Sequence, residues 1–325
     1  MNRLKSNFPI SYSKQTIQKD DINSVSKALT KQYLTQGGLV DKFEKNLAKY
    51  FKSRYCTVLS NGTAALHLAG RALGWNEKDT IITTPITFVA TANSILYSNS
   101  NPEFVDIDKN TYNIDLNKLE SKIQLLKKNN KKVSAVIGVD YSGSPCDWVE
   151  LRFLANKYSF KLINDNCHAM GSKYKGDRGY AAKYADIVTH SYHAVKNITT
   201  GEGGAILTNS KNIAKKINVL KTHGIEKKSN RHWLYEMEKL GFNYRLTDFQ
   251  SALGITQLSK LNKFVIKKRK NAKKYDISFS DIDNIVLPKI MNQSYHSYHF
   301  YPVRIKRIKD LNTKNKIMES LKKNN

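Results

Sequence analysis

Lys196 lies in a polar stretch, His190–Gly204, that is rich in hydroxyl groups and ends in glycines. Apolar residues on either side, Ile187–Thr189 and Ala205–Thr208, predict two short buried strands. Lys196 therefore falls in a tight connection between core strands, where a flexible, solvated lysine has no structural role. A lysine held near a core can lose its proton and form a Schiff base with a carbonyl compound. A surface lysine in a turn is the alternative, and this one residue does not decide between the two.

A second candidate is Ser60–Thr63, which follows a predicted strand and begins a predicted helix. Backbone amides and hydroxyls at such a helix start suit a phosphate monoester, which makes Gly62 and Thr63 candidate phosphate ligands. A glycine and a hydroxyl before a helix are also typical of an ordinary N-cap. Both interpretations stay open at this point.

Asp165 ends a predicted buried strand, Phe160–Asp165. A buried carboxylate needs a partner, since an unpaired buried charge is costly. A protonated pyridine nitrogen is one such partner, and the ring would then act as an electron sink; a neighbouring loop is the other. His168, three residues later, is placed to hydrogen-bond a phenolic oxygen.

Phe88 follows Thr84–Thr87 and is placed either to lay its ring on a bound cofactor or to join the core at a helix start. Together the candidates form an ordered set: phosphate at Gly62 and Thr63, ring at Phe88, ring nitrogen at Asp165 and aldehyde at Lys196. That set predicts a site for pyridoxal 5′-phosphate (PLP). Chance agreement of all its parts is far less probable than any single alternative.

A metal site is the competing interpretation of the cysteine and histidines in these stretches. Their spacing matches no zinc-ligand pattern, and no second paired cluster exists, so we expect no metal. The residues concerned are Cys167, His168, His190 and His193.

The composition limits the class of protein. At 325 residues and 40% hydrophobic, the chain can form one large core and a smaller second domain. No apolar run approaches the roughly 18 residues needed to span a bilayer, and Met1–Ser11 lacks the apolar core of a signal peptide. Three cysteines are too few for a disulfide framework, so we expect a cytoplasmic protein with no membrane partner.

The net charge of +27 raises the question of nucleic-acid binding. The excess is mostly lysine spread along the chain, as in the loop-like Lys127–Lys132. No basic stretch interleaved with aromatic residues and no helix-turn-helix pattern is present. We therefore expect no nucleic-acid partner, and attraction of anionic, phosphate-bearing small substrates is the simpler use of the charge.

Strands and helices alternate along the chain, with uniformly apolar strands. This pattern predicts an α/β fold with a mostly parallel sheet between helices, in which ligands bind at the carboxyl ends of strands. A long helix is expected from Thr247, and Tyr298–Ile305 is expected to form a strand of a smaller domain. The other expected strands are Cys56–Leu59, Ile81–Thr84, Glu103–Asp106, Val133–Val139 and Lys161–Asn164, and the helices are Asp20–Leu29, Val40–Phe51, Ala64–Ala72, Phe88–Tyr97, Leu116–Leu126 and Trp148–Tyr158.

Long motifs support a family assignment. They are Tyr33–Gly37, Thr84–Asn93, Asp165–Ala169, Ser191–Lys196, Thr199–Gly204 and Gly241–Asp248. In these motifs the chain resembles the DegT/StrS family of sugar-nucleotide aminotransferases, which are fold type I PLP enzymes. The resemblance runs from about Ile10 to Tyr301.

The resemblance implies roles for individual residues. Lys196 would bind the cofactor aldehyde, Asp165 would pair with the pyridinium, and His168 would lie near the ring hydroxyl. Ser191 would contact the phosphate, and Asn243 would reach the phosphate of the other subunit's cofactor, which implies a homodimer. The residues expected near the nucleotide sugar are Tyr12, Tyr33, Leu34, Thr35 and Ser60.

The resemblance also implies a reaction. Tyr12-Ser13, Ile86–Phe88 and Val139–Gly143 favour the branch of the family that acts in pseudaminic acid biosynthesis, which supports surface polysaccharide or flagellin glycosylation. Its members move an amino group, from glutamate, to the C4 ketone of a UDP-4-keto-6-deoxy-N-acetylhexosamine. The alternatives are a different keto sugar nucleotide, or an inactive protein that only binds a sugar nucleotide. A related dehydratase carries histidine in place of the lysine, so Lys196 argues against it.

Two domains are expected: a large PLP-binding domain over residues 1–250 and a small α+β domain over 251–325. Relatives continue past Asn325, so the resemblance implies that this small domain is truncated.

Overall fold

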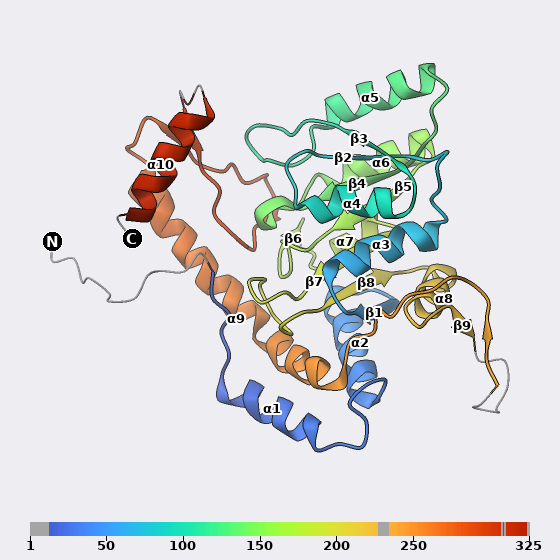
Figure 1. Ribbon diagram of the computed structural model, residues 1–325. Coiled ribbons are helices and arrows are strands. Elements are labelled where there is room, and N and C mark those ends of the chain that lie inside the picture. Colours follow the sequence, from blue (N-terminus) through green and yellow to red (C-terminus); the bar gives the residue numbers. More distant parts are fainter. Residues whose placement is uncertain (1–12, 227–233, 307, 309, 324–325) are drawn as a thin grey trace.

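The computed structural model of the protein describes residues 13–226, 234–306, 308 and 310–323. A seven-stranded sheet lies at its centre (Figure 1). The strands in spatial order are β1 (Tyr55–Leu59), β8 (Gly204–Thr208), β7 (Ile187–Ser191), β5 (Lys161–Asp165), β4 (Val133–Val139), β2 (Thr80–Thr83) and β3 (Asn101–Phe104). β8 runs antiparallel to both of its neighbours, and the other pairs are parallel. The mostly parallel sheet expected from the sequence is confirmed.

Helices cover both faces of the sheet. Side chains alternate between the faces along a strand, so Leu162 and Ile163 of β5 join two different apolar clusters. One cluster is closed by α2 (Gly38–Phe51), α5 (Leu116–Lys128), α6 (Trp148–Tyr158), α7 (Tyr180–Tyr184) and α9 (Asp248–Phe279). The other is closed by α3 (Gly62–Leu73), α4 (Val89–Tyr97) and α8 (Lys211–Leu220).

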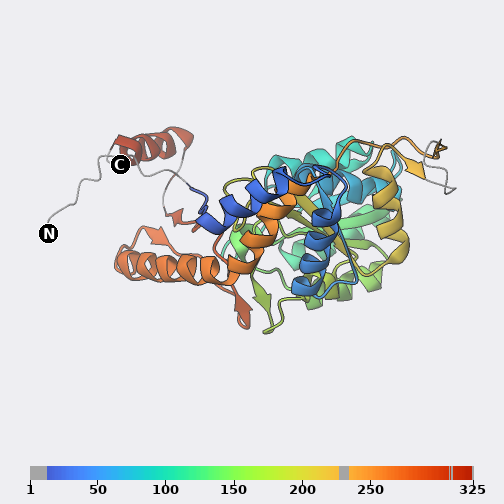
Figure 2. The ribbon, with the colours of Figure 1, turned by 90° about the horizontal axis from the view of Figure 1, so that it is seen from below.

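Local capping explains where several of these helices begin. The Asp147 side chain accepts a hydrogen bond from the Glu150 amide at the start of α6. Thr247 and Gln250 form a capping box that begins α9, a continuous helix of 32 residues. In both views the C-terminal half of α9 extends beyond the sheet and its covering helices (Figures 1 and 2).

Short elements complete the described chain. They are α1 (Lys19–Leu29), η1 (Tyr141–Gly143), β6 (Lys173–Tyr174), β9 (Ile225–Glu226), β10 (Glu236–Met237), β11 (Ile285–Val286), β12 (Ser294–Tyr295), β13 (Arg304–Ile305) and α10 (Leu311–Lys323). α1 packs against α9, and β12 pairs with β6. Within the described ranges, no helix has the length and apolarity needed to cross a membrane.

Two differences from the sequence-based expectation concern residues near the site and at the sheet edge. The strand expected over Tyr298–Ile305 is wrong, because only Arg304–Ile305 is paired. The Ser297 amide instead donates to the carbonyl of Gly143, and the His299 amide donates to that of Ser142, so this segment packs against η1. β3 begins two residues earlier than expected, with Asn101 opposite Thr80 of β2.

Candidate active site

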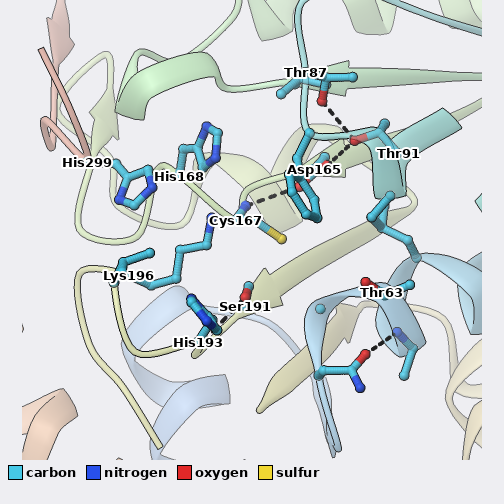
Figure 3. Close-up of a pocket in the computed structure, with 18 of the residues that line it drawn as sticks. Thr63, Thr87, Thr91, Asp165, Cys167, His168, Ser191, His193, Lys196 and His299 are labelled. Carbon is cyan, nitrogen blue, oxygen red and sulfur yellow. Dashed lines mark hydrogen bonds between the residues drawn. The ribbon is translucent and has the colours of Figure 1, made fainter. Parts of the chain in front are cut away.

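One cavity of about 900 Å³, here called the main cavity, opens at the carboxyl ends of the central strands (Figure 3). Parallel strands bring distant residues to such an edge. Seven residues predicted from the sequence line it: Gly62, Thr63, Phe88, Asp165, His168, Ser191 and Lys196. The structure therefore brings the predicted set together around one space.

Asp165 lies at the last position of β5 and is 5% exposed. Its Oδ2 accepts a hydrogen bond from the Thr91 hydroxyl at 2.8 Å, and its Oδ1 accepts from the Cys167 amide at 3.2 Å. The Thr91 hydroxyl also contacts that of Thr87 at 2.8 Å. Within the part of the chain that the structure describes, no cation pairs with this carboxylate. A nearly buried charge held by neutral donors alone is suited to a cation that arrives from the cavity.

Lys196 lies in the loop between β7 and β8, as predicted. The ends of this loop are tied together, because the Tyr192 amide donates to the Gly203 carbonyl at 2.7 Å. The Lys196 amide donates to the His193 carbonyl at 2.9 Å. Figure 3 shows the Lys196 side chain directed toward Cys167 and His168, on the same side of the sheet as Asp165. The lysine and the aspartate therefore face one space.

His168 is a half-buried, neutral imidazole whose Nδ1 atom is shielded from solvent. Burial, and then the positive charge of Lys196, lower its pKa to about 3. Its ring stacks on that of His299, with centroids 4.6 Å apart and planes 28° apart. Its Nδ1 has no hydrogen-bond partner among the described residues. A buried polar atom without a partner costs free energy, so this nitrogen is ready to bond a ligand.

The N-terminus of α3 forms the opposite wall of the main cavity. The Asn61 side chain accepts from the Ala64 amide at 2.8 Å and supplies the N-cap, so Thr63 is not needed as a cap. A Cβ on Gly62 would lie 2.8 Å from the Cβ of Ser191. Glycine therefore allows the end of β7 to approach the helix start, where backbone amides favour an anion.

Phe88 is 65% exposed and lines the main cavity, so the alternative of a core phenylalanine is wrong. Its ring is free to contact a bound ring.

The expected sugar-contacting residues do not reach the main cavity of this chain. Tyr33 and Leu34 are exposed, and Thr35 forms an isolated bridge with Thr247. Ser60 is not among the residues that line the cavity, and its amide donates to the carbonyl of Tyr244, which does line it. Asn243 likewise does not line it. Tyr12 lies outside the described residues.

Sequence reasoning missed several lining residues. Thr91 lies one helical turn beyond Thr87, within a motif that was noted, but only the fold shows that its hydroxyl reaches Asp165. His299 and Phe300 come from the segment that was expected to be a strand. The run of aromatic residues in this segment was the sequence feature that could have indicated a role in the site. Within the described chain, no group of three or more His, Cys, Asp or Glu side chains is arranged to hold a metal ion.

The residues present fit PLP. Asp165 offers a carboxylate without a cationic partner among the described residues, and His168 offers a buried nitrogen without a hydrogen bond. Gly62 allows Ser191 to lie close to a helix N-terminus, and Phe88 offers an exposed ring. Lys196 lies among them.

Comparisons with known proteins agree with this geometry. A model of the DegT/DnrJ/EryC1/StrS aminotransferase family matches residues 15–325. The chain is 43% identical over 294 residues to the UDP-4-amino-4,6-dideoxy-N-acetyl-beta-L-altrosamine transaminase of Campylobacter jejuni subsp. jejuni serotype O:23/36 (strain 81-176). The aligned region covers 90% of this chain and 76% of that protein.

Solved structures give the same result. Helicobacter pylori PseC, an aminotransferase involved in the biosynthesis of pseudoaminic acid, matches with a TM-score of 0.89 and 33% identity, over 97% of this chain and 82% of that one. The PMP-form of Spr1654 from Streptococcus pneumoniae matches with a TM-score of 0.88 and 26% identity, over 97% and 83%. The fold is therefore fold type I, and the cofactor is PLP. The chain belongs to the DegT/DnrJ/EryC1/StrS aminotransferase family and is a sugar aminotransferase.

Proposed function

We propose that this enzyme transfers an amino group from glutamate to the C4 ketone of a UDP-4-keto-6-deoxy-N-acetylhexosamine, in pseudaminic acid biosynthesis. The similarity to the Campylobacter and Helicobacter enzymes supports this choice of substrate. The observation that carries the chemistry is the placement of Lys196, Asp165 and His168 around one cavity.

Each residue of the main cavity then has a role. PLP, when bound, supplies an aromatic ring that withdraws electrons from the donor's α-carbon. Lys196 holds the cofactor through its Nζ and, when released, carries the proton to and from the donor's α-carbon. Asp165 keeps the ring nitrogen protonated, and the hydroxyl of Thr91 fixes that carboxylate.

The remaining contacts orient the cofactor. Gly62, Thr63 and Ser191 hold the phosphate, and the face of Phe88 packs on the ring. The Nδ1 of His168, which lacks a partner among the described residues, takes the hydrogen bond with the ring hydroxyl.

A homodimer completes the site in this proposal. Asn243 lies outside the main cavity of its own chain, which supports a role toward the partner's cofactor phosphate. Tyr12, Tyr33, Leu34, Thr35 and Ser60 would contact the nucleotide sugar. We further propose that residues 1–250 and 251–325 form the large and small domains and that the enzyme acts in the cytoplasm.

Lys196→Ala tests the proposal. The variant should lose the visible absorbance of the bound cofactor and all amino transfer, because Lys196 is the one lysine among the described residues that line the main cavity. The wild-type enzyme, given glutamate and UDP-4-keto sugars of both C5 configurations, should yield a 4-amino sugar by mass spectrometry and NMR. Lys211→Ala, at an exposed position on α8, is the matched control. Retention of absorbance and transfer in Lys196→Ala would disprove the assignment.

A further inference from the structure

A second, smaller cavity of about 200 Å³ adjoins Lys196 from the side of α9. Its cationic lining comes from Lys14, Lys196, Lys267 and Lys268, and no Asp or Glu side chain is among its lining residues. We call it the lysine cavity. Lys196 lines both cavities, so both spaces lie beside the residue proposed to hold the cofactor.

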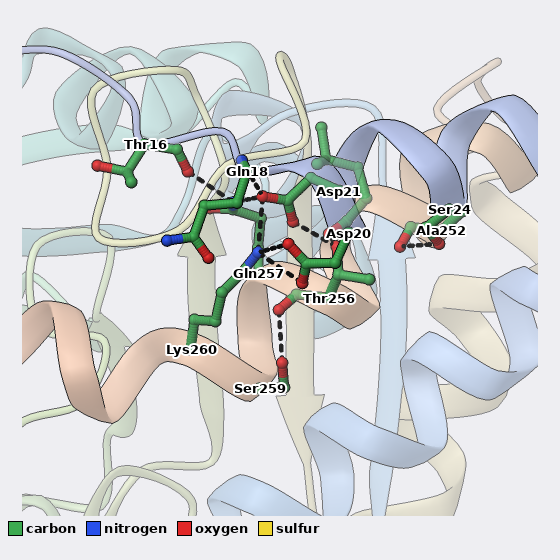
Figure 4. A network of polar contacts seen from close by, with 11 residues as sticks. Thr16, Gln18, Asp20, Asp21, Ser24, Ala252, Thr256, Gln257, Ser259 and Lys260 are labelled. Atoms are coloured by element: carbon green, nitrogen blue, oxygen red, sulfur yellow. Dashed lines mark hydrogen bonds and ion pairs between the residues drawn. The ribbon is translucent and has the colours of Figure 1, made fainter.

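The walls of the lysine cavity are fixed by a buried polar network (Figure 4). The Gln257 side-chain amide donates to the Thr16 carbonyl at 2.9 Å and to the Asp21 carboxylate at 3.0 Å. Lys260 pairs with the same carboxylate at 2.6 Å and with Asp20 at 2.9 Å. These bonds hold residues 13–16 against α9, so the lysine cavity is a built feature.

Lys268 differs from Lys260, although both lie on α9. Its ammonium donates to the His299 carbonyl at 3.2 Å and forms no ion pair with any described residue. Burial, and then the charge of Lys196, lower its pKa to about 8. A half-buried ammonium without a counter-ion favours an anion that enters the cavity.

The main cavity offers few cations to the carboxylates of a substrate. Among the described residues, its lining contains one lysine, Lys196, and no arginine, together with Asp165 and Glu202. In the proposed reaction, an acidic amino donor brings its amino group to the position of Lys196, which it replaces. Within the described part of the same chain, the cations that line a cavity next to that position are those of the lysine cavity.

We propose that the lysine cavity binds a carboxylate of the amino donor, with Lys268 as the principal cation. This inference rests on the proposed function and names the place where its donor is recognised. The shared chemistry is a small anion, and the diphosphate of the sugar nucleotide is the other possible source. A cavity of about 200 Å³ is suited to a short acidic chain.

Lys268→Met tests the inference, with Lys270→Met on the same helix as control, since Lys270 is exposed and does not line the cavity. The KM for glutamate should rise about tenfold or more, as expected for loss of a charged hydrogen bond, and the KM for the keto sugar should stay within about twofold. Lys268→Arg should recover most of the loss. Retained cofactor absorbance and circular dichroism would show that the variant folds.

Binding of glutarate, which has no amino group to transfer, supplies a second readout by calorimetry. The wild-type enzyme and Lys270→Met should bind it, and Lys268→Met should bind it about tenfold more weakly. Unchanged glutarate affinity and glutamate KM in Lys268→Met would overturn the inference. A rise in the keto-sugar KM alone would also overturn it and assign the cavity to the diphosphate. Should the wild-type enzyme fail to aminate any keto sugar, the proposed function fails, while glutarate binding still decides the inference.

Discussion

Two buried carboxylates in this protein have opposite surroundings. Asp21, on α1, is fully buried and is saturated by Lys260, Thr256 and Gln257 of α9. Burial alone would raise its pKa, but the bonds from Lys260 and Thr256 hold that pKa below the usual value. Asp165 is almost as buried, yet among the described residues it receives hydrogen bonds from only Thr91 and the Cys167 amide.

The two carboxylates differ in where a counter-charge lies. Asp21 is paired with Lys260 within the chain and stabilises the fold. Asp165 lines the main cavity and is oriented by neutral donors among the described residues, which suits a cationic ligand. The lysines of α9 repeat this contrast, with Lys260 paired and Lys268 unpaired among the described residues.

The largest effect should come from Asp165→Asn. The amide oxygen can still accept the hydrogen bond from Thr91, but the bond from the Cys167 amide is lost, and the side chain cannot hold a protonated ring nitrogen. We expect amino transfer to fall about a hundredfold to a thousandfold, while the unfolding free energy falls by only about 1 kcal/mol for the lost hydrogen bond. Steady-state kinetics and urea titration measure the two quantities. If the variant lost stability and kept its activity, Asp165 would be a structural carboxylate, contrary to our proposal.

Lys260→Met should show the opposite profile. It leaves Asp21 buried without a cation, which costs about 3–5 kcal/mol of unfolding free energy. Adding Asp21→Asn should recover part of that loss, because the two residues act as one pair. Urea unfolding of both single variants and the double variant measures the coupling, and additive losses would contradict it.

Histidines that are neutral in the fold predict how the free energy of unfolding depends on pH. Burial lowers the pKa of His168, His190 and His296 to about 3. In the unfolded chain the pKa of histidine is about 6.5, so below that pH the unfolded chain binds protons that the native chain does not bind. The free energy of unfolding should therefore fall as the pH drops from about 6.5 toward about 3. Asp140 acts in the opposite direction between about pH 4 and pH 6, since burial raises its pKa to about 6.

His190→Gln isolates one of these contributions. His190 is fully buried, and its Nε2 has no partner among the described residues. The variant should weaken the dependence of unfolding free energy on pH by about 1.4 kcal/mol per pH unit between pH 4 and pH 6. Urea titrations at three pH values measure the slope. An unchanged slope would show that His190 does not remain neutral in the fold.

Much of the fold could be predicted from local pattern. Val133–Val139 and Trp148–Tyr158 have the expected bounds, because an apolar run and the Asp147 cap define them. α8 was missed, although Ile213, Ile217 and Leu220 have helical spacing after the Ser210 cap. The lysines between these apolar residues made the helical spacing hard to recognise in the sequence.

The site was predictable where chemistry and local pattern coincide, as at Asp165 and Lys196. It was not predictable where a side chain acts through tertiary packing. His299 stacks on His168 from more than a hundred positions away along the chain, and no local pattern marks that contact. Lys268 resembles its exposed neighbour Lys270 in sequence, and only the burial of its side chain separates the two.

The reversed direction of β8 has a consequence for Lys196. A parallel neighbour would require the chain to cross to the opposite edge of the sheet, whereas an antiparallel one lets the loop of residues 192–203 begin and end at the same edge. Lys196 therefore lies in a loop whose two ends are held together by the pairing of Ser191 with Gly204. Closing the loop in this way restricts the motion of the backbone at the Cα atom of Lys196. The positions that its ammonium can reach are then set mainly by rotation about the bonds of its own four methylene groups.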